Sequence, residues 1–274
     1  MSAPASSRGG GERRGAPLRV ALGEYDTGWH DPATSLARAG ALVARAAGGG
    51  ARLVVLPETC TTGFTMDAGR FAEPADGPAA RALAALAREH GTWIVAGLAL
   101  RERAADGAER ASNAAVVLDP RGEVAALYRK QRLFAYAGEH RHYSAGAEPV
   151  VVTVDGVRVA PFICYDLRFP ELFRRVAADV DLLVVIANWP AERRPHWDAL
   201  VRARAIENLC YVVAVNRTGE GGTLRYDGGS VAYGPWGDLA ACAATATGDA
   251  PAMVDVDPSE VARVREAYPF LADR

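Results

Sequence analysis

Three side chains that could act together in one reaction each follow an apolar run of strand type. They are Glu58 after residues 53–56, Lys130 after residues 124–128, and Cys164 after residues 157–163. Ligands of α/β sheets collect at the carboxyl ends of strands, so the pattern predicts that the three side chains meet at one sheet edge. A carboxylate can accept the thiol proton, the sulfur can attack a carbonyl carbon, and an ammonium group can stabilise the oxygen that becomes negative. These residue types therefore indicate acyl transfer with Cys164 as the nucleophile.

Cys164 stands where a predicted strand ends, and Pro170 suits the start of a helix. A turn at this point frees backbone N–H groups, and a following helix would direct its positive end at the sulfur. Both effects favour a thiolate and later an oxyanion. The alternative interpretation is a small buried hydrophobe, since free cysteines are often buried. A lone carboxylate or lysine at a strand end is usually just solvated, so the hypothesis depends on all three residues together.

Composition describes an ordinary globular protein. The chain has 274 residues, half of them hydrophobic, and a formal net charge of −2. No basic block would bind nucleic acid, and no apolar run is long enough to span a membrane. Residues 1–17, rich in Ser, Gly, Ala, Pro and Arg, are expected to be a disordered N-terminal tail, and residues 18–274 a single domain.

The four cysteines, at positions 60, 164, 210 and 242, have no paired spacing and no CxxC motif. This distribution favours reduced thiols in a cytoplasmic protein over a disulfide framework. Cys210 and Cys242 lie on apolar segments and are expected in the core. Cys60, two residues after Glu58, is a candidate to lie near the site.

Helical and strand patterns alternate along the chain. Helices are expected over residues 32–47, 78–90, 170–178, 196–209 and 259–267. Strands are expected over residues 18–23, 52–56, 93–100, 113–118, 123–129, 181–187, 211–216 and 253–256, in a pair around Asp155-Gly156, and in a second pair within residues 228–243. Because hairpins are interspersed, a layered α/β fold with mixed sheets fits better than a purely parallel one.

The chain carries three segments that resemble the signature segments of the nitrilase, or carbon–nitrogen hydrolase, superfamily. They are Leu-Pro-Glu58-Thr, Arg-Lys130-Gln-Arg-Leu-Phe and Phe-Ile-Cys164-Tyr-Asp-Leu-Arg-Phe-Pro-Glu, in that family's order. The likeness runs from about Leu18 to Val256. It implies a single domain built as a four-layer α-β-β-α sandwich with mixed sheets, and it implies no metal or organic cofactor.

The resemblance also implies roles for individual residues. Cys164 corresponds to the nucleophile, Glu58 to the general base and Lys130 to the cation that stabilises the oxyanion, with the backbone N–H of Tyr165 as the second donor. Glu139 matches a further glutamate that holds the lysine and the substrate in place. On its own, Glu139 would be interpreted as a solvated loop carboxylate.

Finer likeness points to the omega-amidase branch, whose members release ammonia from the terminal amide of 2-oxo acids such as 2-oxoglutaramate. It is carried by Phe134 with Glu139-His140-x-His142-Tyr143, by Ala187-Asn188-Trp189-Pro190, by His196-Trp197, and by Arg202-x-Arg204-Ala-Ile-Glu207-Asn208. Gly23-Glu24 departs from the branch, where many members have a Gln after the first strand.

A substrate of this kind needs a cation for its far carboxylate, and Arg168 is the candidate, although a salt-bridged structural arginine is the alternative. Phe64, Phe134 and Trp189 are candidates for the pocket walls, or else plain core aromatics. The expected partner is a small-molecule amide, and the resemblance implies a homodimer or higher homo-oligomer.

Four other functions remain open at this point. An N-carbamoyl amino acid amidohydrolase or a nitrilase would share the same three residues and differ in the pocket. A zinc hydrolase could use the pair His140 and His142, but no third ligand has recognisable spacing. A papain-like Cys–His pair would need His196 beside Cys164. The last alternative is a binding module without catalytic activity.

Overall fold

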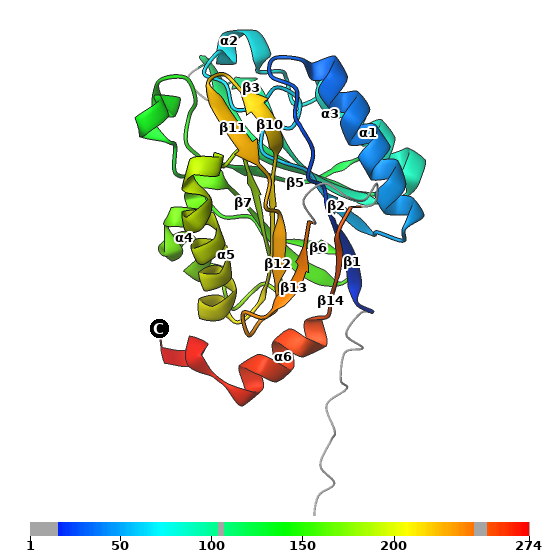
Figure 1. The fold of residues 1–274 in the computed structure, drawn as a ribbon, viewed down its shortest axis with the longest axis vertical. Coiled ribbons are helices and arrows are strands. Elements are labelled where there is room, and N and C mark those ends of the chain that lie inside the picture. Colours follow the sequence, from blue (N-terminus) through cyan, green and yellow to red (C-terminus); the bar gives the residue numbers. More distant parts are fainter. Residues whose placement is uncertain (1–15, 104–106, 244–250, 274) are drawn as a thin grey trace, which may run out of the picture.

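Two six-stranded mixed sheets lie face to face between two layers of helices (Figure 1). This computed structural model describes residues 16–103, 107–243 and 251–273. The predicted four-layer α-β-β-α sandwich in one domain is confirmed for these residues. Most of the predicted N-terminal tail, residues 1–15, lies outside them.

The first sheet has the strand order β14-β1-β2-β3-β4-β5, with parallel pairing from β1 to β3 and antiparallel pairing elsewhere. Its strands are β1 (Leu18–Leu22), β2 (Leu53–Val55), β3 (Trp93–Arg103), β4 (Glu109–Leu118), β5 (Val124–Arg129) and β14 (Met253–Val256). The second sheet has the order β13-β12-β9-β8-β7-β6, with β7, β8 and β9 parallel. Its strands are β6 (Val152–Val154), β7 (Val157–Ile163), β8 (Leu182–Ala187), β9 (Tyr211–Asn216), β12 (Val231–Tyr233) and β13 (Leu239–Cys242).

Helices α1 and α3 cover the first sheet, and α4 and α5 cover the second (Figure 1). The helices are α1 (Pro32–Gly48), α2 (Ala68–Phe71), α3 (Pro78–His90), α4 (Pro170–Arg174), α5 (Arg194–Asn208) and α6 (Pro258–Ala267). The ends of α3 follow the sequence: Pro78 occupies the first turn, and Gly91 closes the helix at φ 59°, a conformation that glycine adopts without strain.

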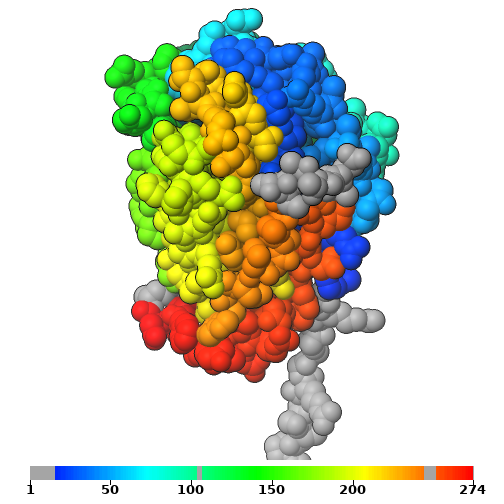
Figure 2. All heavy atoms as spheres, in the orientation of Figure 1, coloured from blue at the N-terminus to red at the C-terminus, as the bar shows by residue number. Residues whose placement is uncertain are grey.

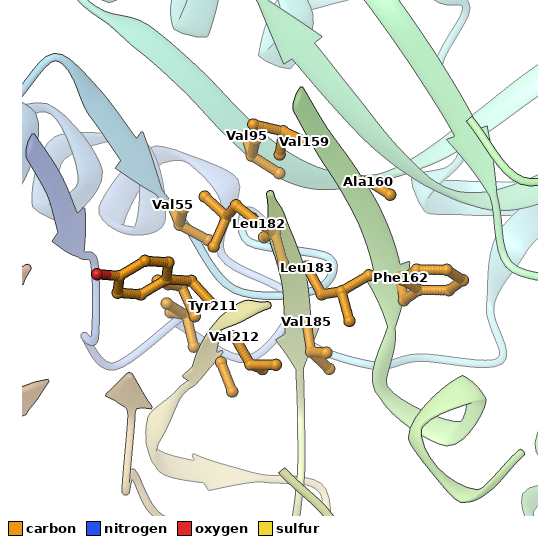
Figure 3. Close-up of a cluster of buried hydrophobic side chains, with 14 of the residues drawn as sticks. Val55, Val95, Val159, Ala160, Phe162, Leu182, Leu183, Val185, Tyr211 and Val212 are labelled. Atoms are coloured by element: carbon orange, nitrogen blue, oxygen red, sulfur yellow. The ribbon is translucent and has the colours of Figure 1, made fainter. Parts of the chain in front are cut away.

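The main core lies between the two sheets. Alternation along β2 shows how it forms, because Leu53 and Val55 point to the other sheet while Val54 points to the helices. Figure 3 shows Val55 and Val95 of the first sheet close to Val159 and Leu182 of the second. Burying each such side chain stabilises the fold by about 1.5–3 kcal/mol, so the facing of the two sheets is fixed by their apolar rows.

The β10–β11 hairpin was not predicted from the sequence. Its strands, β10 (Thr218–Gly221) and β11 (Leu224–Asp227), pair with each other and with neither main sheet, and an isolated bridge joins Thr218 to Asp26. The short helix α2 was also missed. Figure 2 shows the hairpin, in yellow-orange, at the opposite end of the molecule from α6 and the red C-terminal segment. The residues of the β10–β11 hairpin are too polar and glycine-rich to give a strand pattern by themselves.

Other boundaries differ from the prediction. Strands β3 and β4 pair from Ile94↔Leu118 to Arg103↔Glu109, beyond their apolar residues, because backbone hydrogen bonding continues along the hairpin. Residues 104–106 of the predicted polar loop lie outside the described residues. The helix expected over residues 170–178 is shorter and ends at Arg174. None of the helices in the described residues is long and apolar enough to cross a membrane.

Candidate active site

Cys164 lies directly after β7, as predicted, in a turn of left-handed backbone conformation with φ 47°. Such a conformation is unfavourable for a residue other than glycine, so the surrounding contacts must hold it. Asp166 supplies them: its carboxylate accepts hydrogen bonds from the backbone N–H of Ile163 (3.0 Å) and of Arg132 (2.8 Å) and from the Tyr128 hydroxyl (2.7 Å). The expected helix does not begin at the sulfur. A 3₁₀ segment, Cys164–Arg168, comes first, and α4 begins only at Pro170.

Glu58 follows β2 and is completely buried. Its Oε1 accepts hydrogen bonds from Nζ of Lys130 (2.9 Å) and Nδ2 of Asn113 (2.7 Å). Its Oε2 accepts one from the backbone N–H of Asn188 (2.8 Å). A buried carboxylate is tolerated only with such partners, and these fix its orientation.

Lys130 lies between two carboxylates. Its Nζ is 2.9 Å from Glu58 Oε1 and 3.0 Å from Glu139 Oε2, and all three side chains are almost fully buried. Burial by itself lowers the pKa of the Lys130 ammonium, but the charges of Glu139 and Glu58 reverse this and raise it above its ordinary value. Lys130 is therefore charged at neutral pH. Glu139 is held in turn by the backbone N–H of Phe134, 2.6 Å from its Oε2.

The surroundings of the Cys164 thiol favour its protonated form. Burial raises its pKa well above the ordinary value, and the charge of Glu58 raises it further, while Lys130 lowers it. The local backbone was predicted to favour a thiolate, and burial and the charge of Glu58 act in the opposite direction on the same thiol. Two carboxylates and one ammonium already leave a negative charge beside the sulfur, and a thiolate would add a second one.

Two asparagines that the sequence analysis did not assign to the site connect these groups. Nδ2 of Asn113, on β4, donates to Oε1 of Glu58 (2.7 Å) and to Oε1 of Glu139 (2.9 Å). The side-chain amide of Asn188, after β8, donates a hydrogen bond to the backbone carbonyl of Glu58 (2.6 Å). The backbone carbonyl of Asn188 accepts a weak hydrogen bond from Sγ of Cys164 at 3.9 Å. The sequence signals were a polar residue at the start of an apolar run for Asn113, and for Asn188 its place in the Ala187-Asn188-Trp189-Pro190 segment that resembles the omega-amidase branch.

A cavity of about 380 Å³ opens onto Cys164 and Lys130. The five residues predicted to bind substrate, Phe64, Phe134, Tyr165, Arg168 and Trp189, all line it. The sequence analysis did not place several further lining residues there, which include Trp29, Arg193, Leu224 and Tyr226. Leu224 and Tyr226 come from the β10–β11 hairpin, so the missed hairpin forms one wall of the cavity.

The sequence profile described as carbon-nitrogen hydrolase matches residues 19–266, which is most of the chain. The chain belongs to the carbon-nitrogen hydrolase family. It is 36% identical over 225 residues to a 2-oxoglutaramate amidase of Bacillus subtilis, covering 81% of this chain and 85% of that protein. It is 37% identical over 227 residues to omega-amidase YafV of Escherichia coli strain K12, covering 82% and 84%.

The fold of this carbon-nitrogen hydrolase is similar to that of a solved relative. XC1258 from Xanthomonas campestris, a CN-hydrolase superfamily protein with an arsenic adduct in its active site, superimposes with a TM-score of 0.85 at 35% identity. The match covers 94% of this chain and 97% of that one. Sequence and fold therefore both identify this chain as an enzyme of the family that cleaves carbon–nitrogen bonds.

The geometry disfavours two of the alternative sites considered from the sequence. His140 and His142 are exposed, and no three His, Cys, Asp or Glu side chains in residues 16–103, 107–243 and 251–273 are placed to hold a metal ion. His196 is exposed too, and its Nδ1 accepts a hydrogen bond from Arg168 at 3.1 Å. The carboxylate whose charge acts most strongly on the thiol of this carbon-nitrogen hydrolase is that of Glu58.

The remaining cysteines divide in two. Cys60 and Cys210 are buried, and burial raises the pKa of each to about 12, so both are unreactive thiols. Cys242, expected in the core, is exposed. It lies on the edge strand β13, whose residues are mostly exposed, so an apolar run did not mean burial there.

Glu24, which departs from the omega-amidase pattern, has a structural contact. Its Oε2 accepts a hydrogen bond from the backbone N–H of Ser230 at 2.7 Å, and burial raises the pKa of its carboxyl. The residue thus ties the end of β1 to the segment between β11 and β12. It does not line the cavity.

Proposed function

We propose that this carbon-nitrogen hydrolase is an omega-amidase, which releases ammonia from the terminal amide of a 2-oxo acid such as 2-oxoglutaramate. The observation that carries the proposal is the placement of Lys130 between two buried carboxylates, beside the thiol of Cys164, at a cavity with arginines in its wall. The names of the relatives from B. subtilis and E. coli support the choice of substrate.

In the first half-reaction, Sγ of Cys164 attacks the amide carbon while Glu58 accepts the thiol proton. The acceptor is Oε2 of Glu58. This oxygen takes one hydrogen bond, from Asn188, whereas Oε1 takes two, and each carboxylate oxygen has two lone-pair sites. A protonated resting thiol suits a mechanism in which the proton leaves as the carbon–sulfur bond forms.

The negative oxygen of the tetrahedral intermediate is stabilised by Lys130 and by the backbone N–H of Tyr165. An ammonium group has three N–H donors, and Glu58 and Glu139 engage Lys130 from two directions. Because Lys130 also lines the cavity, its third N–H can meet the substrate oxygen. Glu139 holds Lys130 in this position.

The nitrogen then leaves as ammonia, taking the proton from Glu58, and a thioester to Cys164 remains. In the second half-reaction Glu58 accepts a proton from water, the hydroxide attacks the thioester carbon, and the proton returns to the sulfur as the acid leaves. Arg168, in the cavity wall, is placed to bind the far carboxylate of the substrate, and Phe64, Phe134 and Trp189 enclose its apolar chain.

The test measures ammonia released from 2-oxoglutaramate, glutamine, an N-carbamoyl amino acid and a simple nitrile. Cys164→Ala is expected to abolish release, while Cys242→Ala, which removes an exposed thiol elsewhere, is the matched control and should retain it. Preferred turnover of the carbamoyl compound or of the nitrile would assign the enzyme to the corresponding alternative. Unchanged activity of Cys164→Ala would refute the mechanism.

We also propose a homodimer in the cytoplasm. Four exposed apolar side chains gather near the end of α5 and the C-terminal segment: Ile206 (47% exposed), Trp236 (52%), Tyr268 (43%) and Phe270 (56%). The rings of Trp236 and Tyr268 are 4.4 Å apart, so this is a continuous patch of the kind that interfaces cover. Sedimentation equilibrium of the purified protein tests the dimer, and a monomer at micromolar concentration would refute it.

The four free thiols support a reducing compartment such as the cytoplasm, and cell fractionation tests this location.

A further inference from the structure

The cavity wall carries positive charge without a matching carboxylate. Among the described residues that line it, the charged ones are Lys130, Arg168 and Arg193, and none is an aspartate or a glutamate. Glu58 and Glu139 more than offset the charge of Lys130. The positive charge available to a ligand in the cavity therefore comes from the two arginines.

Arg168 is held in place without an ionic partner in the described part of the chain. Its guanidinium lies 4.8 Å from the centre of the Trp189 ring and donates a hydrogen bond to Nδ1 of His196 at 3.1 Å. Neither contact neutralises its charge. A guanidinium stacked on an aromatic ring keeps its N–H groups directed outward at its edge, where a carboxylate can bind.

Arg193 is held in a similar way on the Phe134 ring, 5.5 Å from its centre. Its ion pair is with Glu192, at 3.0 Å, whose side chain is 66% exposed. Exposed ion pairs are weak, so a carboxylate in the cavity can replace Glu192 at little cost. The position of Arg193 is fixed from its backbone, because its carbonyl accepts a hydrogen bond from Nε1 of Trp189 at 2.8 Å.

We propose that Arg168 and Arg193 together act as a charge filter, which binds the carboxylate of the substrate and repels an ammonium group beside it. The inference rests on the proposed function and assigns Arg193 as a second specificity-determining residue. Glutamine differs from 2-oxoglutaramate only at C2, where an ammonium group replaces the keto oxygen. The filter would thus exclude free amino acid amides by charge, since their size and shape are nearly the same.

The repulsion is large enough to decide specificity. Two like charges about 6 Å apart, at an effective dielectric constant of about 20, change a rate roughly a hundredfold. One carboxylate offsets the charge of only one of the two arginines, so the other still repels an ammonium group beside it. An uncharged C2 avoids this repulsion altogether.

The experiment compares kcat/KM for 2-oxoglutaramate, glutamine and glutaramate, which has the carboxylate and an uncharged C2. In Arg193→Gln we expect kcat/KM for 2-oxoglutaramate and glutaramate to fall about tenfold, mainly through KM, while glutamine loses less or gains. Discrimination against glutamine should therefore shrink. Arg193→Lys keeps the charge and should keep most of the discrimination, even where it binds the carboxylate less well.

Arg225→Gln is the matched control. Arg225 is exposed on β11 between Leu224 and Tyr226, which both line the cavity, so its side chain is on the opposite face of the strand. This variant should leave all three values unchanged. If wild-type enzyme is active on 2-oxoglutaramate but Arg193→Gln and Arg168→Gln both keep full discrimination against glutamine, the charge filter is refuted and the proposed function stands. If the wild type releases no ammonia from 2-oxoglutaramate, both are refuted.

Discussion

Replacing Glu139 by glutamine removes one of the two negative charges that hold Lys130. In the native site the Glu139 carboxylate accepts hydrogen bonds from Nζ of Lys130 (3.1 Å to Oε1), Nδ2 of Asn113 (2.9 Å) and the backbone N–H of Phe134 (2.6 Å). All of these partners are donors. The glutamine amide nitrogen is also a donor, so whichever way the side chain turns, at least one donor loses its acceptor.

The cost follows from the geometry. Opposite charges 3.0 Å apart, the distance from Nζ of Lys130 to Oε2 of Glu139, attract by about 5 kcal/mol at an effective dielectric constant of about 20. Removing one member of a buried pair typically costs about 3–5 kcal/mol. Because Glu58 remains as a partner of Lys130, we expect the lower end of that range, about 3 kcal/mol of unfolding free energy.

The kcat of Glu139→Gln should fall as well as its unfolding free energy. With Glu139 neutral, Lys130 is drawn toward Glu58 and away from the substrate oxygen, and loss of one oxyanion donor lowers kcat by about 10²–10³. The charge of Glu139 also raises the pKa of the Cys164 thiol. Its removal should therefore lower that pKa, so thiolate appears at lower pH in the variant than in the wild type.

The assay combines three measurements on Glu139→Gln: steady-state ammonia release, urea unfolding, and the rate of Cys164 alkylation by iodoacetamide as a function of pH. Glu148→Gln is the control, since Glu148 is 76% exposed and pairs with Arg175 at the surface. A kcat within threefold of the wild type, or a thiol titration shifted to higher pH, would show that Glu139 does not act through Lys130.

Two further perturbations test the support of the site. Gly97→Ala places a Cβ about 2.5 Å from Cα of Glu58 and from the backbone nitrogen of Thr59, so we expect about 1–3 kcal/mol of overpacking and at least tenfold lower kcat. Gly48→Ala, where the new Cβ meets nothing within 4 Å, is the control, and equal activity of the two variants would contradict the argument. For Asp166, burial raises the pKa to about 6, so the folded state binds this proton more tightly than the unfolded chain and the stability contribution grows as pH falls. Between pH 7 and pH 5 the unfolding free energy of the wild type should gain about 1 kcal/mol relative to Asp166→Asn, and identical pH dependence in urea titrations would exclude this pKa.

Much of the scaffold follows from local sequence. The 3.6-residue spacing between Pro78 and Gly91 gave α3 with its bounds, because a proline suits the first turn and a glycine the left-handed end. The apolar runs before Glu58, Lys130 and Cys164 gave three strand ends, because burial on both faces requires continuous apolar residues. The bounds of such helices and strands depend on residues only a few positions away in the chain.

The charge state of the site depends on contacts between residues far apart in the chain, and a local sequence pattern does not reveal such contacts. The Cys164 turn favours a thiolate, yet burial first, and then the charges of two carboxylates from distant parts of the chain, raise the pKa of the thiol. Likewise, Asn113 on β4 and Asn188 after β8 are ordinary polar residues, and only the packing of the two sheets brings both of them to Glu58 on β2.

The sequence by itself thus determined most of the elements, the family resemblance and the side chains proposed to react, since residue types and short spacings carry that information. The tertiary structure decided which charged groups lie next to one another and which arginines face the cavity. It also decided that the β10–β11 hairpin forms one wall of that cavity. The physical reason is that electrostatic interactions and cavity shape depend on distances between strands that lie far apart in the chain, and those distances are set only when the two sheets pack together.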